Sequence, residues 1–254
     1  MLQTKNLTKN FKGLCAVNNL NLSIDEGEIV GIIGPNGAGK TTTFDLITGF
    51  LQPTYGNILF EGKDITGRKP HRIARNGIIR TFQLDRIFHD FTVFQNIVAA
   101  SNLVARIGLW EAVWNTSTYS RKAKNTWDHA EKIIQFIGLD DKKNEIARNL
   151  SHGHQKLLGI AVALAANPKL LLLDEPLAGM NPLEVTRALE TIGQIRRRGI
   201  AILLIEHNMR AVMSICDRMV VLNFGTEIAE GAPEELKQNE EVIQAYLGAE
   251  ENAA

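Results

Sequence analysis

Residues 29–49 read IVGIIGPNGAGKTTTFDLITG, which is an apolar run, then a glycine-rich loop, then a segment with helical spacing. The loop fits the pattern GxxxxGK[ST] in the strand, loop and helix setting that this pattern requires. Glycines let backbone N–H groups turn inward around phosphate oxygens, and the following helix presents the positive end of its dipole to the same anion. The sequence therefore predicts a phosphate site formed by Gly34, Pro35, Asn36, Gly37, Ala38, Gly39, Lys40, Thr41 and Thr42.

Two side chains of this loop carry specific chemistry. Lys40 would supply a flexible point charge for the β and γ phosphates of a nucleotide, and the Thr41 hydroxyl can bind Mg²⁺. The alternative is a glycine-rich turn with a solvated lysine. The correct strand and helix on either side of the loop favour the phosphate site.

A second chemical element is the stretch LLLLDE at residues 170–175, an apolar strand that ends in two carboxylates. In an open parallel sheet, ligands bind at the carboxyl ends of the strands. We therefore expect Asp174 near Mg²⁺, and Glu175 in place to orient or deprotonate a water that attacks the γ phosphate. Taken alone, the stretch could equally be an acidic turn after a strand.

The remaining pattern alternates short β-like runs with longer helical ones, which predicts an α/β fold. Early strands, with turn signals typical of antiparallel pairs, are expected at 20–24, 28–33 and 57–60. Later apolar runs are of the kind that a parallel sheet buries on both faces, with helical crossovers between them. These strands are expected at 170–173, 200–205 and 219–222, and the helices at 182–197 and 208–216. The stretch from 93 to 166 is helical in pattern and reads as an insertion.

The composition excludes several classes of protein. With 254 residues, 44% of them hydrophobic, and a formal net charge of zero, the chain is expected to fold as one large domain and not to bind nucleic acid. The longest apolar run, 160–166, is far shorter than the roughly 20 residues of a membrane span. The amino terminus lacks the apolar segment of a secretory signal, and two cysteines without metal spacing suit a reducing compartment. We therefore expect a cytoplasmic protein.

Between the two chemical elements, residues 150–155 read LSHGHQ. This stretch resembles the signature LSGGQ of the ATP-binding subunit of ATP-binding cassette (ABC) transporters. Leu150, Ser151 and Gly153 match, His152 replaces the first glycine, and His154 stands where the family has glutamine. The resemblance covers nearly the entire chain.

The resemblance implies a fold and a domain organisation. The fold is the P-loop NTPase (ABC ATPase) core, with a mainly parallel sheet, an N-terminal antiparallel β subdomain and a helical subdomain. We expect residues 1–254 to form a single ABC ATP-binding domain, with the helical subdomain at about 86–166.

The resemblance also assigns roles to residues that are uninformative alone. Phe11 would stack on adenine, although a lone Phe is more often a core residue. Gln83 would be the Q-loop glutamine that touches Mg²⁺ or the γ phosphate. His207 would be the switch histidine that contacts the γ phosphate. Residues 178–181 would form the D-loop that contacts a second subunit. The signature residues Ser151, Gly153 and Gln155 would face the ATP held by that subunit.

The resemblance implies ATP and Mg²⁺ as cofactors, and it implies three kinds of protein partner. They are a second ABC ATPase subunit, identical or not, integral membrane permease subunits, and a periplasmic or extracellular substrate-binding protein that the chain does not touch. The chain would then lie in the cytoplasm as a peripheral protein on the inner face of the cell membrane.

The stretches 80–97 and 175–182, with the long insertion, resemble the larger ATPase of branched-chain amino acid importers. Related ABC systems for urea, amides, aromatic acids or lipopolysaccharide remain alternatives. So do a soluble ABC ATPase acting in translation or DNA repair, and a nucleotide-binding regulatory subunit with weak hydrolysis. His152 and His154 motivate the last alternative. The transported substrate, the composition of the dimer and the direction of transport stay open at this stage.

Overall fold

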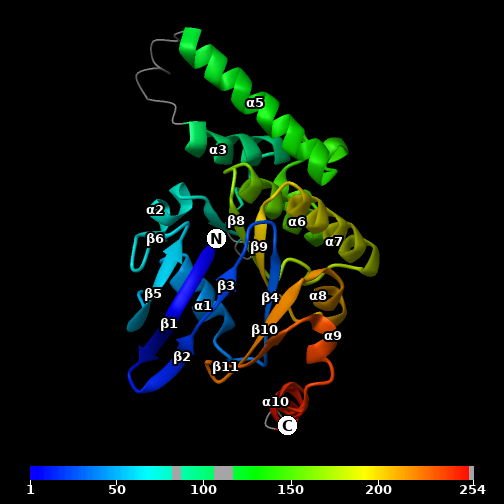
Figure 1. Ribbon diagram of the computed structural model, residues 1–254. Helices are drawn as coiled ribbons and strands as arrows, with labels where there is room; N and C mark the ends of the chain where they lie inside the picture. The colour runs from blue at the N-terminus through cyan, green and yellow to red at the C-terminus, as the bar shows by residue number, and fades with distance from the viewer. Residues whose placement is uncertain (82–86, 106–116, 252–254) are drawn as a thin grey trace. The chain divides into compact units, whose positions relative to one another are not determined.

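The computed structural model describes residues 1–81, 87–105 and 117–251 (Figure 1). The chain forms two compact units. Unit 1 comprises Met1–Arg80, Lys169–Glu175 and Ile192–Ala254, and unit 2 comprises Thr81–Pro168 and Pro176–Thr191. Within the described residues, no helix combines the length and the apolar character that a membrane span needs.

Among the described residues, the larger sheet of unit 1 has six strands in the order β11-β10-β4-β9-β8-β7. All neighbouring pairs are parallel except β10 and β11. The strands are β4 (Ile29–Ile33), β7 (Ile78–Arg80), β8 (Leu170–Asp174), β9 (Ala201–Ile205), β10 (Arg218–Asn223) and β11 (Thr226–Gly231). Every residue of β4, β8 and β9 is buried. Burial on both faces explains why these strands read as continuous apolar runs.

The second sheet of unit 1 is antiparallel, with the order β2-β1-β5-β6 and β3 paired with β1. Its strands are β1 (Leu2–Phe11), β2 (Leu14–Leu20), β3 (Ser23–Ile24), β5 (Tyr55–Phe60) and β6 (Lys63–Asp64). Side chains from both sheets and from helix α1 (Lys40–Ile47) share one hydrophobic core, in which Phe44 of α1 is fully buried. The core fixes α1, and therefore the loop that precedes it, against both sheets.

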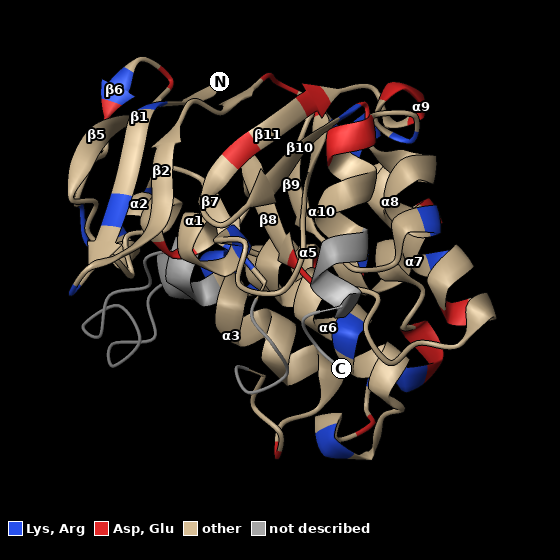
Figure 2. Cartoon of the chain, turned by 90° about the horizontal axis from the view of Figure 1, so that it is seen from below, with Lys and Arg blue, Asp and Glu red and all other residues tan. Residues whose placement is uncertain are grey.

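Within the part of the chain that the structure describes, unit 1 also contains four shorter helices, and unit 2 consists mainly of longer ones. The helices of unit 1 are α2 (Pro70–Arg75), α8 (Met209–Ile215), α9 (Pro233–Leu236) and α10 (Glu240–Glu251). In unit 2, α3 (Val93–Ala105), α5 (Ser117–Ile137) and α6 (His152–Leu164) pack on one another, and α7 (Pro182–Arg197) begins there. Figure 2 shows basic and acidic residues scattered over many elements, so the neutral net charge arises from mixed charges.

A buried amide holds the chain before α3. The Asn96 side chain is 2% exposed, donates to the Phe88 and Thr92 carbonyls at 3.0 Å each, and accepts from the Phe88 N–H at 2.8 Å. Because a buried amide is costly unless it is bonded, these contacts define the turn that leads into α3.

The structure confirms the expected α/β architecture, with its antiparallel sheet, its mainly parallel sheet and its helical part. The strands expected at 170–173, 200–205 and 219–222 lie within one residue of β8, β9 and β10. The strand expected at 28–33 lies within one residue of β4, but the antiparallel pairing expected for it is wrong, because β4 pairs in parallel with β9 and β10. The helix expected at 182–197 coincides with α7, and residues 208 and 216 are the N-cap and C-cap of α8.

The strand expected at 20–24 is wrong. Strand β2 ends at Leu20, and β3 contains only Ser23–Ile24. The Thr4 hydroxyl accepts from the Leu22 N–H at 2.8 Å and donates to the Leu20 carbonyl at 2.9 Å. A side chain from another strand therefore satisfies the backbone there, and no local pattern indicates that contact. The sequence patterns do not predict strands β1, β2, β6, β7 and β11, most of which are short or largely polar.

Candidate functional site

The glycine-rich loop joins β4 to α1, as its pattern predicts, and two of its glycines are required by close backbone contacts. Gly34 has a φ of +146°, and a Cβ there would lie 2.1 Å from the Leu222 carbonyl oxygen. Gly39 has a φ of +100°, and a Cβ would lie 2.4 Å from the Ala16 carbonyl oxygen. No side chain can replace either hydrogen without moving backbone. The backbone of the loop therefore packs closely against the backbone at Leu222 and at Ala16.

Lys40 lies across this loop. Its ammonium donates to the Gly34 carbonyl at 2.7 Å and to the Pro35 carbonyl at 2.9 Å, and the residue is 6% exposed. Burial lowers the pKa of Lys40, while the Glu175 and Asp174 carboxylates act to raise it. A buried cation next to a loop of backbone N–H groups is a site that favours an anion.

Glu175 and His207 form a hydrogen-bonded pair beside the loop. Their Oε1 and Nε2 atoms are 3.0 Å apart, and each residue follows one of the adjacent parallel strands β8 and β9. Glu175 has a φ of 47°, and its N–H donates to the Ile205 carbonyl at 2.9 Å. The carboxylate of Glu206, which is 4% exposed, accepts from the N–H of His207 at 3.0 Å and orders the chain that carries the imidazole.

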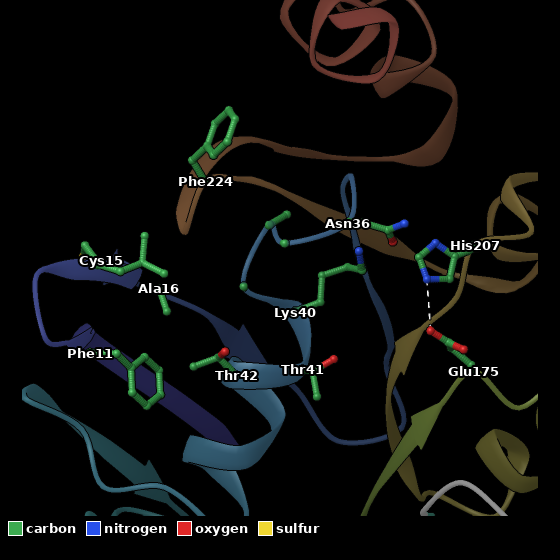
Figure 3. Close-up of a pocket in the computed structure, with 14 residues that line it drawn as sticks. Phe11, Cys15, Ala16, Asn36, Lys40, Thr41, Thr42, Glu175, His207 and Phe224 are labelled. Atoms are coloured by element: carbon green, nitrogen blue, oxygen red, sulfur yellow. Dashed lines mark hydrogen bonds and ion pairs between the residues drawn. The ribbon is translucent and has the colours of Figure 1, made fainter. Parts of the chain in front are cut away.

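These groups open onto one pocket of about 390 Å³ (Figure 3). In that view Phe11 lies on the left, the Glu175 and His207 pair lies on the right, and Lys40 and Thr41 lie between them. The lining residues are Phe11, Leu14, Cys15, Ala16, Asn36, Gly37, Ala38, Gly39, Lys40, Thr41, Thr42, Glu175, His207 and Phe224. The volume is within the range of small-molecule sites, and an aromatic ring lies at one end with an anion site at the centre.

Asp174 lies beside the pocket as the last residue of β8. Its carboxylate is paired with Arg80, whose guanidinium also contacts Asp45 on α1. Sequence reasoning missed Arg80 and Asp45. The sequence around these two residues does not indicate Asp174 as their partner.

The signature residues lie in unit 2, at the start of α6. Ser151 is the N-cap, and its Oγ lies 3.3 Å from the His154 N–H nitrogen and 2.9 Å from His154 Nδ1. Gly153 is buried next to the Glu184 carboxylate. The Gln155 amide donates to the Ala147 and Leu150 carbonyls, at 3.2 and 3.3 Å. It therefore bonds to the backbone of its own unit.

The segment 178–181 is held next to the signature within the same unit. A Cβ on Gly179 would lie 2.8 Å from His152 Nδ1, so the imidazole packs on this backbone. Asn181 caps α7 by accepting from the N–H groups of Leu183 and Glu184, both at 3.0 Å. Gln83, the remaining expected site residue, lies outside the described residues.

The side chains fit a magnesium-bound nucleotide. Mg²⁺ prefers hard oxygen ligands and is usually held by one or two protein groups together with substrate phosphates. The Thr41 hydroxyl and the Asp174 carboxylate are such groups. Thr41 follows Lys40 in the chain and lines the same pocket, and the Asp174 carboxylate is near enough to Lys40 to act on its pKa. The glycine cradle and the Lys40 ammonium would hold the phosphates.

Comparisons with known proteins identify the family of the chain. A family model described as "ABC transporter" matches residues 17–178, and one described as "Branched-chain amino acid ATP-binding cassette transporter" matches residues 227–252. The chain is 43% identical over 249 residues to the "High-affinity branched-chain amino acid transport ATP-binding protein LivG" of Escherichia coli K12, covering 98% of each chain.

Two further relatives extend the comparison. The "High-affinity branched-chain amino acid transport ATP-binding protein BraF" of Pseudomonas aeruginosa is 40% identical over 249 residues, again covering 98% of each chain. Among solved structures, a nucleotide-free ATP-binding cassette from an ABC transporter is 32% identical, with a TM-score of 0.84. The match covers 97% of this chain and 98% of that one.

Proposed function

This chain belongs to the ABC transporter family as an ATP-binding cassette, and from that premise we propose that it hydrolyses ATP to drive an importer of branched-chain amino acids. One observation carries the proposal. A single pocket joins a phosphate loop to a glutamate and a histidine that are paired at 3.0 Å. The names of the LivG and BraF relatives, and the second family model over residues 227–252, support the amino acid class.

Nucleotide binding would use one end of the pocket for the base and the loop for the phosphates. Phe11, at the end of β1, would stack on adenine. The loop N–H groups and Lys40 would bind the phosphates. Lys40 would then exchange its bonds to the Gly34 and Pro35 carbonyls for charge-assisted bonds to phosphate oxygens.

Hydrolysis would use the Glu175 and His207 pair. Glu175 would accept a proton from the attacking water as the water oxygen bonds to the γ phosphorus and the bond to the leaving ADP oxygen breaks. His207 would hold the carboxylate through Nε2 and contact the γ phosphate. Thr41, Asp174 and Gln83 would hold Mg²⁺, which supplies charge neutralisation for the phosphates.

Transport requires an assembly around the cassette. We propose that the chain acts as one ATP-binding domain, with its helical subdomain at about 86–166. In the assembly it would pair with a second cassette. Ser151, Gly153 and Gln155 would face the nucleotide of that partner. Integral permease subunits would bind the pair at the inner face of the membrane, and a substrate-binding protein would deliver the solute outside the cell.

Two alternatives are less well supported. A regulatory subunit with weak hydrolysis would not need the paired Glu175 and His207, which here have the arrangement of a general base and its orienting partner. A related system for urea, amides, aromatic acids or lipopolysaccharide would share the core, but the C-terminal match at residues 227–252 favours the branched-chain class.

Reconstitution tests the proposal. The chain would be purified with the membrane subunits that accompany it and placed in liposomes with the cognate binding protein. We expect leucine, isoleucine or valine to stimulate ATP turnover, and Lys40→Met to abolish that stimulation. Stimulation by another solute class would overturn the substrate assignment, and failure to bind Mg²⁺-ATP would overturn the assigned activity.

A further inference from the structure

Arg80 is a buried cation that joins two acidic residues beside the proposed site. Its side chain is 6% exposed, and its guanidinium nitrogens lie 2.5 Å from Asp45 Oδ1 and 2.6 Å from Asp174 Oδ2. The Asp174 side chain is itself only 9% exposed. Hydrogen bonds between ionised groups are the strong ones, and the planar fork of Arg suits two carboxylates.

The same guanidinium connects two elements of the site. It lies over the ring of Phe44, 5.4 Å from the centroid, and bonds to Asp45, the next residue on α1. On its other side it bonds to the terminal carboxylate of β8. Helix α1 begins with Lys40, so Arg80 joins the helix that carries the phosphate loop to the strand that carries Asp174.

The charges of this cluster are also balanced. Arg80 alone would neutralise Asp174 and weaken its attraction for a cation. With Asp45 bound to the same guanidinium, the three side chains together keep one negative charge. The cluster can therefore hold the carboxylate in one orientation and still attract a metal ion.

We propose that Arg80, with Asp45 as its counter-charge, is a positioning residue that fixes the Asp174 carboxylate for the metal ion of the bound nucleotide. This inference rests on the proposed function, because the metal ion arrives with ATP. Sequence resemblance assigns nothing to either Arg80 or Asp45. Their role follows from the two short contacts and the burial of the guanidinium.

A double variant separates position from charge. Arg80→Met with Asp45→Asn removes the guanidinium and one carboxylate, so the cluster keeps the same net charge without its bridge. We expect the affinity for Mn²⁺ in the presence of ADP, measured by electron paramagnetic resonance, to fall about tenfold, as for other partners that orient metal ligands. ADP binding in EDTA, measured by calorimetry, should stay unchanged.

Arg218 provides the matched control. It also contacts two acidic residues, Glu28 and Glu230, in the same unit, but neither carboxylate is an expected ligand of the metal ion. Arg218→Met should lower the thermal midpoint without changing the Mn²⁺ affinity. If both arginine substitutions weakened Mn²⁺ binding equally, the effect would be general destabilisation and the proposal would be wrong.

A conservative variant covers the case in which the double variant does not fold. Arg80→Lys keeps the charge, but a single ammonium cannot present the two-sided fork, so we expect an intermediate loss of Mn²⁺ affinity. Wild-type affinity in either variant would overturn the positioning role. Absence of metal-dependent nucleotide binding in the wild-type chain would instead overturn the proposed function.

Discussion

At the scale of single residues, the backbone of Glu175 is strained where the chemistry is proposed. Its φ of 47° lies in the left-handed region, which costs a non-glycine residue about 1–2 kcal/mol. The bond from its N–H to the Ile205 carbonyl and the contact with His207 hold it there. The Glu175 carboxylate held in this way lines the pocket beside Lys40.

Glu175→Gln tests the aimed carboxylate. The amide keeps the size of the side chain but cannot accept a proton, so we expect ATP turnover to fall by about 10²–10⁴-fold while nucleotide affinity is retained. Phosphate release and fluorescent nucleotide binding would measure the two effects. Turnover equal to that of the wild type would remove the assigned base.

At the scale of elements, the buried parallel strands carry the site. The carboxyl ends of β8 and β9 place Asp174, Glu175 and His207 at the same edge of the sheet, and β4 ends there in the phosphate loop. Because every residue of these strands is buried, their packing decides how accurately the side chains are placed.

Leu203→Ala in β9 tests this packing. Leu203 is fully buried, and its truncation should leave a cavity and lower the free energy of unfolding by about 2–5 kcal/mol. Urea denaturation would measure the change. Leu183→Ala is the control, because Leu183 is 62% exposed and its loss should change stability by less than about 0.5 kcal/mol. Equal effects of the two substitutions would contradict the packing argument.

Strand β11 carries an acidic residue, Glu227, whose ionisation makes the stability of the fold depend on pH. Burial raises the pKa of Glu227 above its ordinary value of 4.5, although Arg218 acts to lower it. The folded state therefore binds the proton more tightly than the unfolded state, and stability is lost as the pH rises from 4.5 through the folded-state pKa.

Glu227→Gln removes this loss. We expect a higher thermal midpoint than the wild type at pH 8 and no difference at pH 3.5, where the carboxyl is neutral in both states. Thermal unfolding at the two pH values would measure the change. An equal gain at both values would mean that the ionisation of Glu227 does not matter.

At the scale of the whole molecule, the site residues are divided between two units. The phosphate loop, Asp174, Glu175 and His207 belong to unit 1, whereas the signature segment 150–155 belongs to unit 2. If the signature faces the nucleotide of a second cassette, as proposed, nucleotide should protect the phosphate loop in a single chain. It should protect the signature segment only when two chains associate.

Hydrogen exchange can separate these responses. With Mg²⁺-ATP and dilute Glu175→Gln protein, we expect slower exchange in residues 34–42 and unchanged exchange in 150–155. At high protein concentration the segment 150–155 should also become protected, because a second copy binds. Protection of both segments at every concentration would contradict assembly through the signature.

Much of the site could be predicted because it is encoded in short segments. The phosphate loop can be recognised from glycines and a lysine between a strand and a helix. The pair Asp174 and Glu175 can be recognised from the apolar strand that precedes it. These signals depend on neighbours along the chain, so a pattern of a few residues is sufficient. The alternation of strands and helices followed from the same local periodicities, whereas the sheet to which residues 28–33 belong did not.

The sequence by itself determined which segments carry phosphate and carboxylate chemistry, and in which order. Only the tertiary structure decided which side chains meet. Arg80 bonds to residues 35 and 94 positions away, and Glu175 to a histidine 32 positions away, at separations that no spacing rule predicts. The physical reason is that such contacts depend on the register of neighbouring strands and on the packing of α1, which the whole core sets together.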